Sequence, residues 1–119
     1  KLVKRRLYKL EIEELLQEYR ELIQPYAQAK ANLAYVEDFK KSKLAMCMKK
    51  AERDGIKTVS TQEREARTDP EYLNVIDGLK VAVQEESRLR FLLKRVELEI
   101  EIWRTKQADN RMERKAYNA

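Results

Sequence analysis

The feature that most constrains this chain is a run of apolar residues spaced alternately by four and three positions. From Tyr8 to Val36 every position of this heptad pattern is apolar. Such spacing keeps one stripe of an α-helix, which we call the seam, facing a partner helix. The pattern therefore predicts a long coiled-coil helix. Its seam residues are Tyr8, Ile12, Leu15, Tyr19, Leu22, Tyr26, Ala29, Leu33 and Val36.

A second long segment repeats the spacing in the C-terminal half, with polar residues at Glu86, Gln107, Asn110 and Arg114. Because the connection between the two segments is short, we expect the helices to fold back antiparallel. The predicted fold class is all-α: a long antiparallel helical hairpin (coiled coil) with a short connecting helix. The second seam comprises Val75, Leu79, Ala82, Glu86, Leu89, Leu93, Val96, Ile100, Trp103, Gln107, Asn110, Arg114 and Tyr117.

Composition agrees with long solvated helices around a narrow core. The chain has 119 residues, of which 39% are charged, and it has only two Gly and two Pro. This length predicts a single helical domain over residues 1–119. Cys47 is the only cysteine, so no internal disulfide can form, which favours a reducing compartment. The longest apolar run, residues 44–48, is far too short to span a membrane, and we find no secretory signal pattern.

Helix boundaries follow from local signals. The first helix is expected over about residues 2–54, kinked near Pro25, since proline removes a backbone donor. The seam keeps its phase through Pro25, which favours a continuous helix over a break at Gln24 and a three-helix bundle. Two successive steps of four near Lys40 form a stutter, and Gly55 supplies a C-cap.

Two start signals come after Gly55. Ser60 and Glu63 form a capping box that predicts a short helix over about residues 60–68. Asp69 as N-cap and Pro70 in the first helical position predict a long helix over about residues 70–114. We interpret Gly78, inside that helix, as a site of close helix approach rather than a hinge.

The hairpin also predicts which residues lie opposite one another. To within one helical turn, Val36 is expected opposite Leu89, Tyr26 opposite Leu98 or Ile100, and Leu22 opposite Trp103. This pairing brings the two ends of the chain together.

Several apolar residues lie outside both seams. Phe91 and Leu98 occupy the heptad position opposite the seam, with Ile102 beside them. Helices that are apolar on two faces bury both, so we expect self-association into a four-helix arrangement, most simply a two-fold dimer. The candidate oligomer-interface residues are Phe91, Leu98, Ile102, Leu16 and Ile23.

The residues needed for common catalytic chemistry are missing from this sequence. There is no histidine, one cysteine cannot form a thiolate zinc cluster, and the two glycines are too far apart for a phosphate loop. A row of Glu residues between Glu11 and Glu21 could hold a hard cation, but we interpret it as a solvated acidic face. We therefore expect a protein that is not an enzyme, with no catalytic residue, metal or cofactor.

The formal net charge of +5 is unevenly distributed. Basic residues dominate the first nine positions and residues 104–115, and an antiparallel hairpin brings these clusters to one end. Exposed Arg and Lys clusters of this kind suggest an anionic partner such as nucleic acid, although Lys-rich faces are also ordinary solubilising surface. The candidate nucleic-acid-binding residues are Lys4, Arg5, Arg6, Arg104, Lys106, Arg111, Arg114 and Lys115.

A sequence pattern in residues 61–112 resembles small helical proteins encoded by tailed bacteriophages. Those proteins have an E-x-x-A-R-x-x-x-E-Y segment, here residues 63–72, before a long helix ending in Trp-Arg or a similar pair, here Trp103 and Arg104. The resemblance implies an accessory role in phage DNA recombination or replication, in the cytoplasm of a bacterial host. The implied partners are a second copy of the chain, DNA, and a recombination or replication protein, with no membrane. The alternative is a protein-interaction adaptor, scaffold or phage-encoded inhibitor that binds no nucleic acid.

Overall fold

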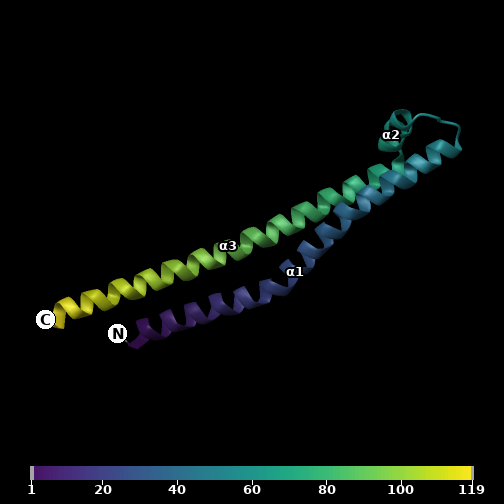
Figure 1. Ribbon diagram of the computed structural model, residues 1–119. Coiled ribbons are helices and arrows are strands. Elements are labelled where there is room, and N and C mark those ends of the chain that lie inside the picture. The colour runs from purple at the N-terminus through teal and green to yellow at the C-terminus, as the bar shows by residue number, and fades with distance from the viewer. Residues whose placement is uncertain (1, 119) are drawn as a thin grey trace. The chain divides into compact units, whose positions relative to one another are not determined.

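The computed structural model describes the backbone of residues 2–118 and the side chains of residues 9–118. This part of the chain forms α1 (Leu2–Arg53), α2 (Val59–Thr68) and α3 (Pro70–Asn118), and contains no strand (Figure 1). The predicted all-α class with a short connecting helix is therefore confirmed. None of the helices in this span has both the length and the apolarity needed to cross a membrane.

The two long helices pair in two compact units. Unit 1 consists of Lys1–Tyr26 and Leu89–Ala119, and unit 2 of Ala27–Arg88. Unit 1 therefore joins the first half of α1 to the second half of α3, whereas unit 2 contains the second half of α1, all of α2 and the first part of α3. Since the start of one helix pairs with the end of the other, the pairing is antiparallel, as predicted.

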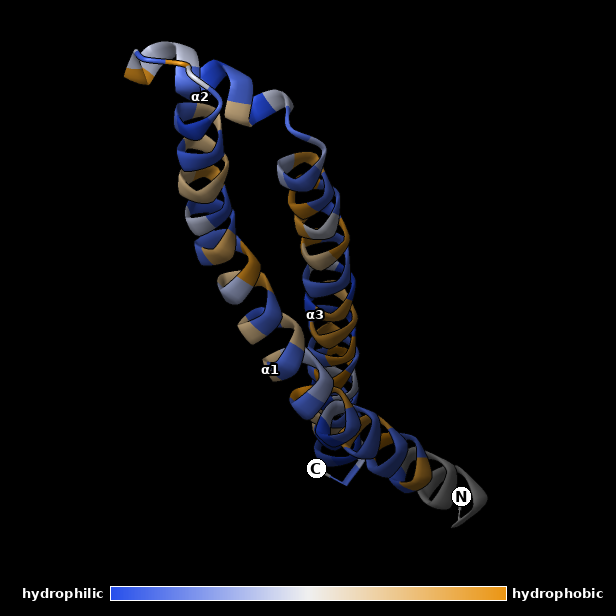
Figure 2. Cartoon of the chain, turned by 90° about the vertical axis from the view of Figure 1, so that its right-hand side faces the viewer, coloured by the Kyte–Doolittle hydropathy of each residue, from blue (hydrophilic) through white to orange (hydrophobic). Residues whose placement is uncertain are grey.

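Burial follows the predicted seams. Leu15 and Ala29 are buried on α1, and Leu89 and Val96 are buried on α3. The side chain of Tyr8 lies outside the described residues, and the other seam residues are partly buried, apart from the last two positions of α3, which are exposed. Figure 2 shows the result as short apolar bands along α1 and α3 between longer hydrophilic stretches. Within the described residues both predicted seams are thus confirmed, except at the end of α3.

The predicted stutter is visible in the burial of α1. Lys40 and Leu44 are partly buried, and Cys47 and Ala51 are buried, so the contact stripe takes two successive steps of four after Val36. Pro25 lies inside α1, and the helix continues through it. The alternative of a break at Gln24 is therefore wrong. The division of α1 between the two units falls one residue after the proline.

Gly55 ends α1 as predicted. Its φ of 100° lies in the left-handed region, the Ile56 amide donates to the Ala51 carbonyl at 3.1 Å, and the Gly55 amide donates to the Glu52 carbonyl at 3.1 Å. These two bonds form a Schellman motif. The helix ends at Arg53, one residue before the expected position.

The start of α2 differs from the prediction. Thr58, not Ser60, is the N-cap, because its hydroxyl accepts the Thr61 amide at 3.4 Å. The capping box of Ser60 and Glu63 is therefore wrong, since the helix begins at Val59 and Ser60 already lies within its first turn. Glu63 instead accepts a hydrogen bond from Arg67, 2.7 Å away.

Asp69 caps α3 as predicted. Its carboxylate accepts the Glu71 amide at 2.9 Å, and Pro70 occupies the first helical position. The helix runs to Asn118, four residues beyond the expected end. The predicted close approach at Gly78 is wrong, because a Cβ added there meets nothing within 4 Å.

The predicted register between α1 and α3 is also wrong. In unit 1 the Tyr19 hydroxyl donates to Glu97 at 3.3 Å, and Arg95 pairs with Glu18 at 2.5 Å. With Leu22 opposite Trp103, as predicted, Tyr19 would lie more than two helical turns further along α3. In unit 2 the register is shifted in the same direction, because Lys50 pairs with Asp69 at 3.3 Å, whereas the predicted pairing places Lys50 opposite a residue further along α3. The start of α3 therefore packs beside the last turns of α1, and the residues that connect the two helices are not shared equally between them.

Candidate functional site

The predicted basic residues of α3 lie in its last turns. Lys106, Arg111, Arg114 and Lys115 are exposed, and none forms an ion pair with another described side chain. Arg104 differs, because its guanidinium lies 3.4 Å from the Glu101 carboxylate. Four of the five predicted α3 residues therefore keep their hydrogen-bond donors available to an external anion.

The basic residues near the N-terminus lie on the same unit. Lys4, Arg5 and Arg6 belong to the first turns of α1, although their side chains lie outside the described residues. Within unit 1, these turns are at the same end as the last turns of α3 (Figure 1). We call this region the basic end, and it comprises Lys4, Arg5, Arg6, Lys106, Arg111, Arg114 and Lys115.

Elsewhere on α2 and α3, several arginines are engaged by neighbouring carboxylates. Arg67 pairs with Glu63, Arg88 with Glu85, and Arg95 with both Glu99 and Glu18. The hydrogen bonds to these carboxylates raise the pKa of all three guanidinium groups. Arg111 and Arg114 have no such partner among the described side chains, so the basic end differs from these sites in pairing as well as in charge.

The predicted interface residues of α3 form a single exposed stripe. Phe91, Leu98 and Ile102 are 60%, 56% and 54% exposed, and their spacing of seven and four places them on one face of the helix. The Arg90 guanidinium lies over the Phe91 ring, 4.8 Å from its centre. We call these three residues the apolar stripe. Unit 1 leaves them in contact with solvent, as the sequence predicted for a single hairpin.

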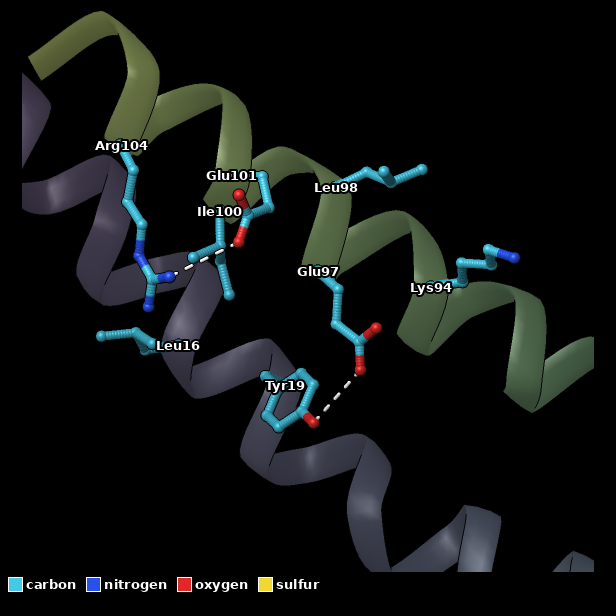
Figure 3. A pocket seen from close by; sticks show the side chains of 8 residues that line it. All are labelled: Leu16, Tyr19, Lys94, Glu97, Leu98, Ile100, Glu101 and Arg104. Carbon is cyan, nitrogen blue, oxygen red and sulfur yellow. Dashed lines mark hydrogen bonds and ion pairs between the residues drawn. The ribbon is translucent and has the colours of Figure 1, made fainter. Parts of the chain in front are cut away.

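Leu16 and Leu98 line a shared open groove of about 450 Å³ on unit 1. Tyr19 and Ile100 also line it, and Figure 3 shows the Tyr19 hydroxyl turned toward Glu97. Ile23 does not line the groove, but it is 49% exposed and lies one heptad after Leu16. The charged residues around the groove are Lys94, Glu97, Glu101 and Arg104.

A polar cluster that sequence reasoning missed closes the hairpin turn in unit 2. Lys43 pairs with Glu71 at 3.1 Å, and Lys50 pairs with Asp69 at 3.3 Å. Cys47 lies between the two lysines on α1 and packs with Ala66 and Tyr72 in the buried core of this unit. Spacing along α1 could have suggested this arrangement, because Lys43, Cys47 and Lys50 share one helical face.

Electrostatics around this cluster favour a structural role. Burial raises the pKa of the Cys47 thiol, so it stays protonated and weakly nucleophilic. The Glu71 amide and then the Lys50 ammonium lower the pKa of Asp69. Ligand atoms of Cys47, Asp69 and Glu71 lie within 4.8 Å of one another, the spacing of a metal site. Each carboxylate already pairs with a lysine, so we interpret the group as an ion-pair network.

Residues 62–72, from α2 and the start of α3, pack the turn. Ala66 and Tyr72 are buried, and the Gln62 side chain donates to the Ile56 carbonyl at 2.8 Å. These contacts give Gln62, Ala66 and Tyr72 a structural role in the turn.

Comparison with known protein families, curated proteins and solved structures found no match for this chain.

Proposed function

We propose that this protein binds nucleic acid through the basic end of unit 1. The observation that carries the proposal is the difference in pairing along α3. Arg88, Arg95 and Arg104 are engaged by Glu residues, whereas Arg111 and Arg114 extend from exposed turns without a carboxylate partner among the described residues. Unpaired guanidinium groups bind phosphate without first giving up an internal ion pair.

This arrangement supports recognition of the phosphate backbone. The proposed contacts are charge-based, and such contacts fix a protein on a nucleic acid without reading its sequence. The end of the α3 seam strengthens the proposal, because Arg114 occupies a seam position yet is exposed. A residue at such a position is released from packing against α1 and can reach a ligand.

The biological role that we propose is that of an accessory protein in phage DNA recombination or replication, acting without catalysis. Its support is the resemblance of residues 61–112 to small phage proteins, together with the basic end. A recombination or replication protein is a further proposed partner.

The test is a titration of fluorescent single-stranded and double-stranded DNA at several salt concentrations. Wild type should bind with an affinity that falls steeply as salt rises. Replacing Arg111, Arg114 and Lys115 with Gln should reduce the slope of log affinity against log salt by about 0.7–0.9 for each phosphate interaction that the substitutions remove.

The matched control replaces Lys30, Lys41 and Lys49 with Gln, which removes the same charge from exposed positions of unit 2. We expect its slope to stay close to that of wild type. An equal reduction in the control would indicate nonspecific attraction by net charge and contradict a site at the basic end. No binding by wild type at low salt would overturn the proposal.

The apolar stripe supports a second candidate function, that of an adaptor or scaffold without nucleic-acid binding. Exposed apolar patches of this kind often mark protein-interaction sites. Under this alternative, the basic residues are ordinary solubilising surface at the ends of the helices. The same titration would then show no binding of DNA at any salt concentration.

A further inference from the structure

We infer that the apolar stripe of α3 binds the same stripe of a second copy of this chain, antiparallel, around a two-fold axis beside Leu98. This inference concerns unit 1 alone and does not depend on the proposed binding of nucleic acid. It assigns the interface, its direction and its register.

The size of the apolar surface limits what can cover it. Phe91, Leu98 and Ile102 are each a little over half exposed, so together they present on the order of 300 Å² of apolar surface. A stable interface buries about 800 Å² on each partner. The interface must therefore extend beyond the stripe, and the groove beside Leu98 supplies further apolar surface from Leu16 and Ile100.

Charges beside the stripe select a second copy as the occupant. Lys94 and Glu101 are exposed, lie on opposite sides of Leu98 along the helix, and both line the groove. In an antiparallel pair centred beside Leu98, Lys94 lies opposite the partner's Glu101, and Glu101 lies opposite the partner's Lys94. The same symmetry places Phe91 within one turn of the partner's Ile102. One sequence thus provides both halves of an interface with matched charge and apolar contacts.

Side-chain directions agree with this arrangement. Figure 3 shows Leu98 and Lys94 extending away from α1, where a second helix can reach them. Lys94 has no ion-pair partner among the described side chains, and Glu101 has only the 3.4 Å contact with Arg104. A partner's lysine can therefore pair with Glu101 while disturbing only one weak, exposed contact.

The experiment measures self-association by sedimentation equilibrium, without nucleic acid, over about 1 to 100 µM protein. Wild type should be dimeric at the upper end of that range. Lys94→Glu alone and Glu101→Lys alone should each raise the dimer dissociation constant on the order of tenfold, because the symmetry repeats each repulsive pair twice. The double variant, Lys94→Glu with Glu101→Lys, should restore the wild-type constant.

Restoration by the double variant is the decisive result, because only a reciprocal pairing between two copies gains from exchanging both charges. Circular dichroism checks that each variant is as helical as wild type. The control Val81→Glu changes an exposed apolar residue of unit 2 and should leave the constant unchanged. A wild-type monomer at the highest concentration, or a double variant as weak as the single ones, would overturn the inference. Neither outcome decides whether the basic end binds nucleic acid, because that proposal has its own assay.

Discussion

A single carboxylate, that of Asp69, caps α3 and pairs with α1. It accepts the Glu71 amide at 2.9 Å and lies 3.3 Å from the Lys50 ammonium. The cap was predictable from sequence, because Asp followed by Pro at a helix start is a local signal. The ion pair was not, because Lys50 lies nineteen residues earlier in the chain and the contact depends on where α2 packs.

We predict that Asp69 makes stability depend on pH. Its pKa is lowered in the folded state, so its contribution is fully present above the unfolded pKa and is lost as pH falls through the folded value. Asp69→Ala should lower the urea midpoint at neutral pH, because both the cap and the ion pair disappear. Asp69→Asn should lower it less, because an amide oxygen still caps the helix.

Urea titrations at neutral and acidic pH measure both effects. The difference between wild type and Asp69→Ala should shrink in acid, where the wild-type carboxylate is protonated. The control Asp77→Ala removes an exposed carboxylate further along α3 and should change the midpoint little. Equal midpoints for wild type and Asp69→Ala at neutral pH would contradict this role.

At the scale of the helices, the sequence predicted periodicity well and register poorly. Within the described residues the stutter and both seams, apart from the last two positions of α3, were predicted correctly, because burial along a coiled coil follows heptad spacing. A periodic seam remains a seam when it slides by one heptad, so the pattern alone cannot select the pairing. The predicted pairing places Tyr19 opposite Lys106, nine residues and thus somewhat more than one heptad beyond the observed partner Glu97.

The two glycines provide a prediction at this scale, because their backbone conformations differ. Gly55 has a φ of 100°, so Gly55→Ala should destabilise the protein by about 1–2 kcal/mol. Gly78 lies inside α3, where an added Cβ meets nothing within 4 Å. Gly78→Ala should therefore stabilise by about 1 kcal/mol, since alanine is the better helix former.

Chemical denaturation of both variants and of wild type measures the expected loss of stability for Gly55→Ala and the expected gain for Gly78→Ala in one experiment. Each variant serves as the control for the other, because the substitution is chemically the same. Destabilisation by Gly78→Ala would show that another surface, such as a partner helix, approaches α3 at that position.

At the scale of the molecule, the candidate sites were only partly readable from sequence. The clusters of basic residues were evident, because charge can be counted along the chain. The pairing of Arg104 with Glu101 and the groove lined by both Leu16 and Leu98 were not, because they depend on side-chain direction and register. The ion-pair network around Cys47 escaped prediction for the same reason.

The last prediction joins the basic end to the inferred dimer. Arg111 lies thirteen residues after Leu98, or about 20 Å along the helix, so an antiparallel dimer holds two basic ends about 40 Å apart. On a long DNA duplex both ends can bind one molecule, which strengthens binding through effective concentration. Leu98→Glu should give a monomer with one basic end. Its affinity for a long duplex should fall at least tenfold, and its salt slope should be about half that of wild type.

Duplex length supplies the sharpest control. A duplex of about eight base pairs, roughly 27 Å long at 3.4 Å per pair, is too short to reach both ends, so wild type and Leu98→Glu should bind it with the same salt slope. On a duplex of about thirty base pairs their slopes should separate, while Val81→Glu should follow wild type on both lengths. Equal slopes for wild type and Leu98→Glu on the long duplex, with the variant shown to be monomeric, would contradict binding by two ends. Each basic end would then act alone, whatever the oligomeric state.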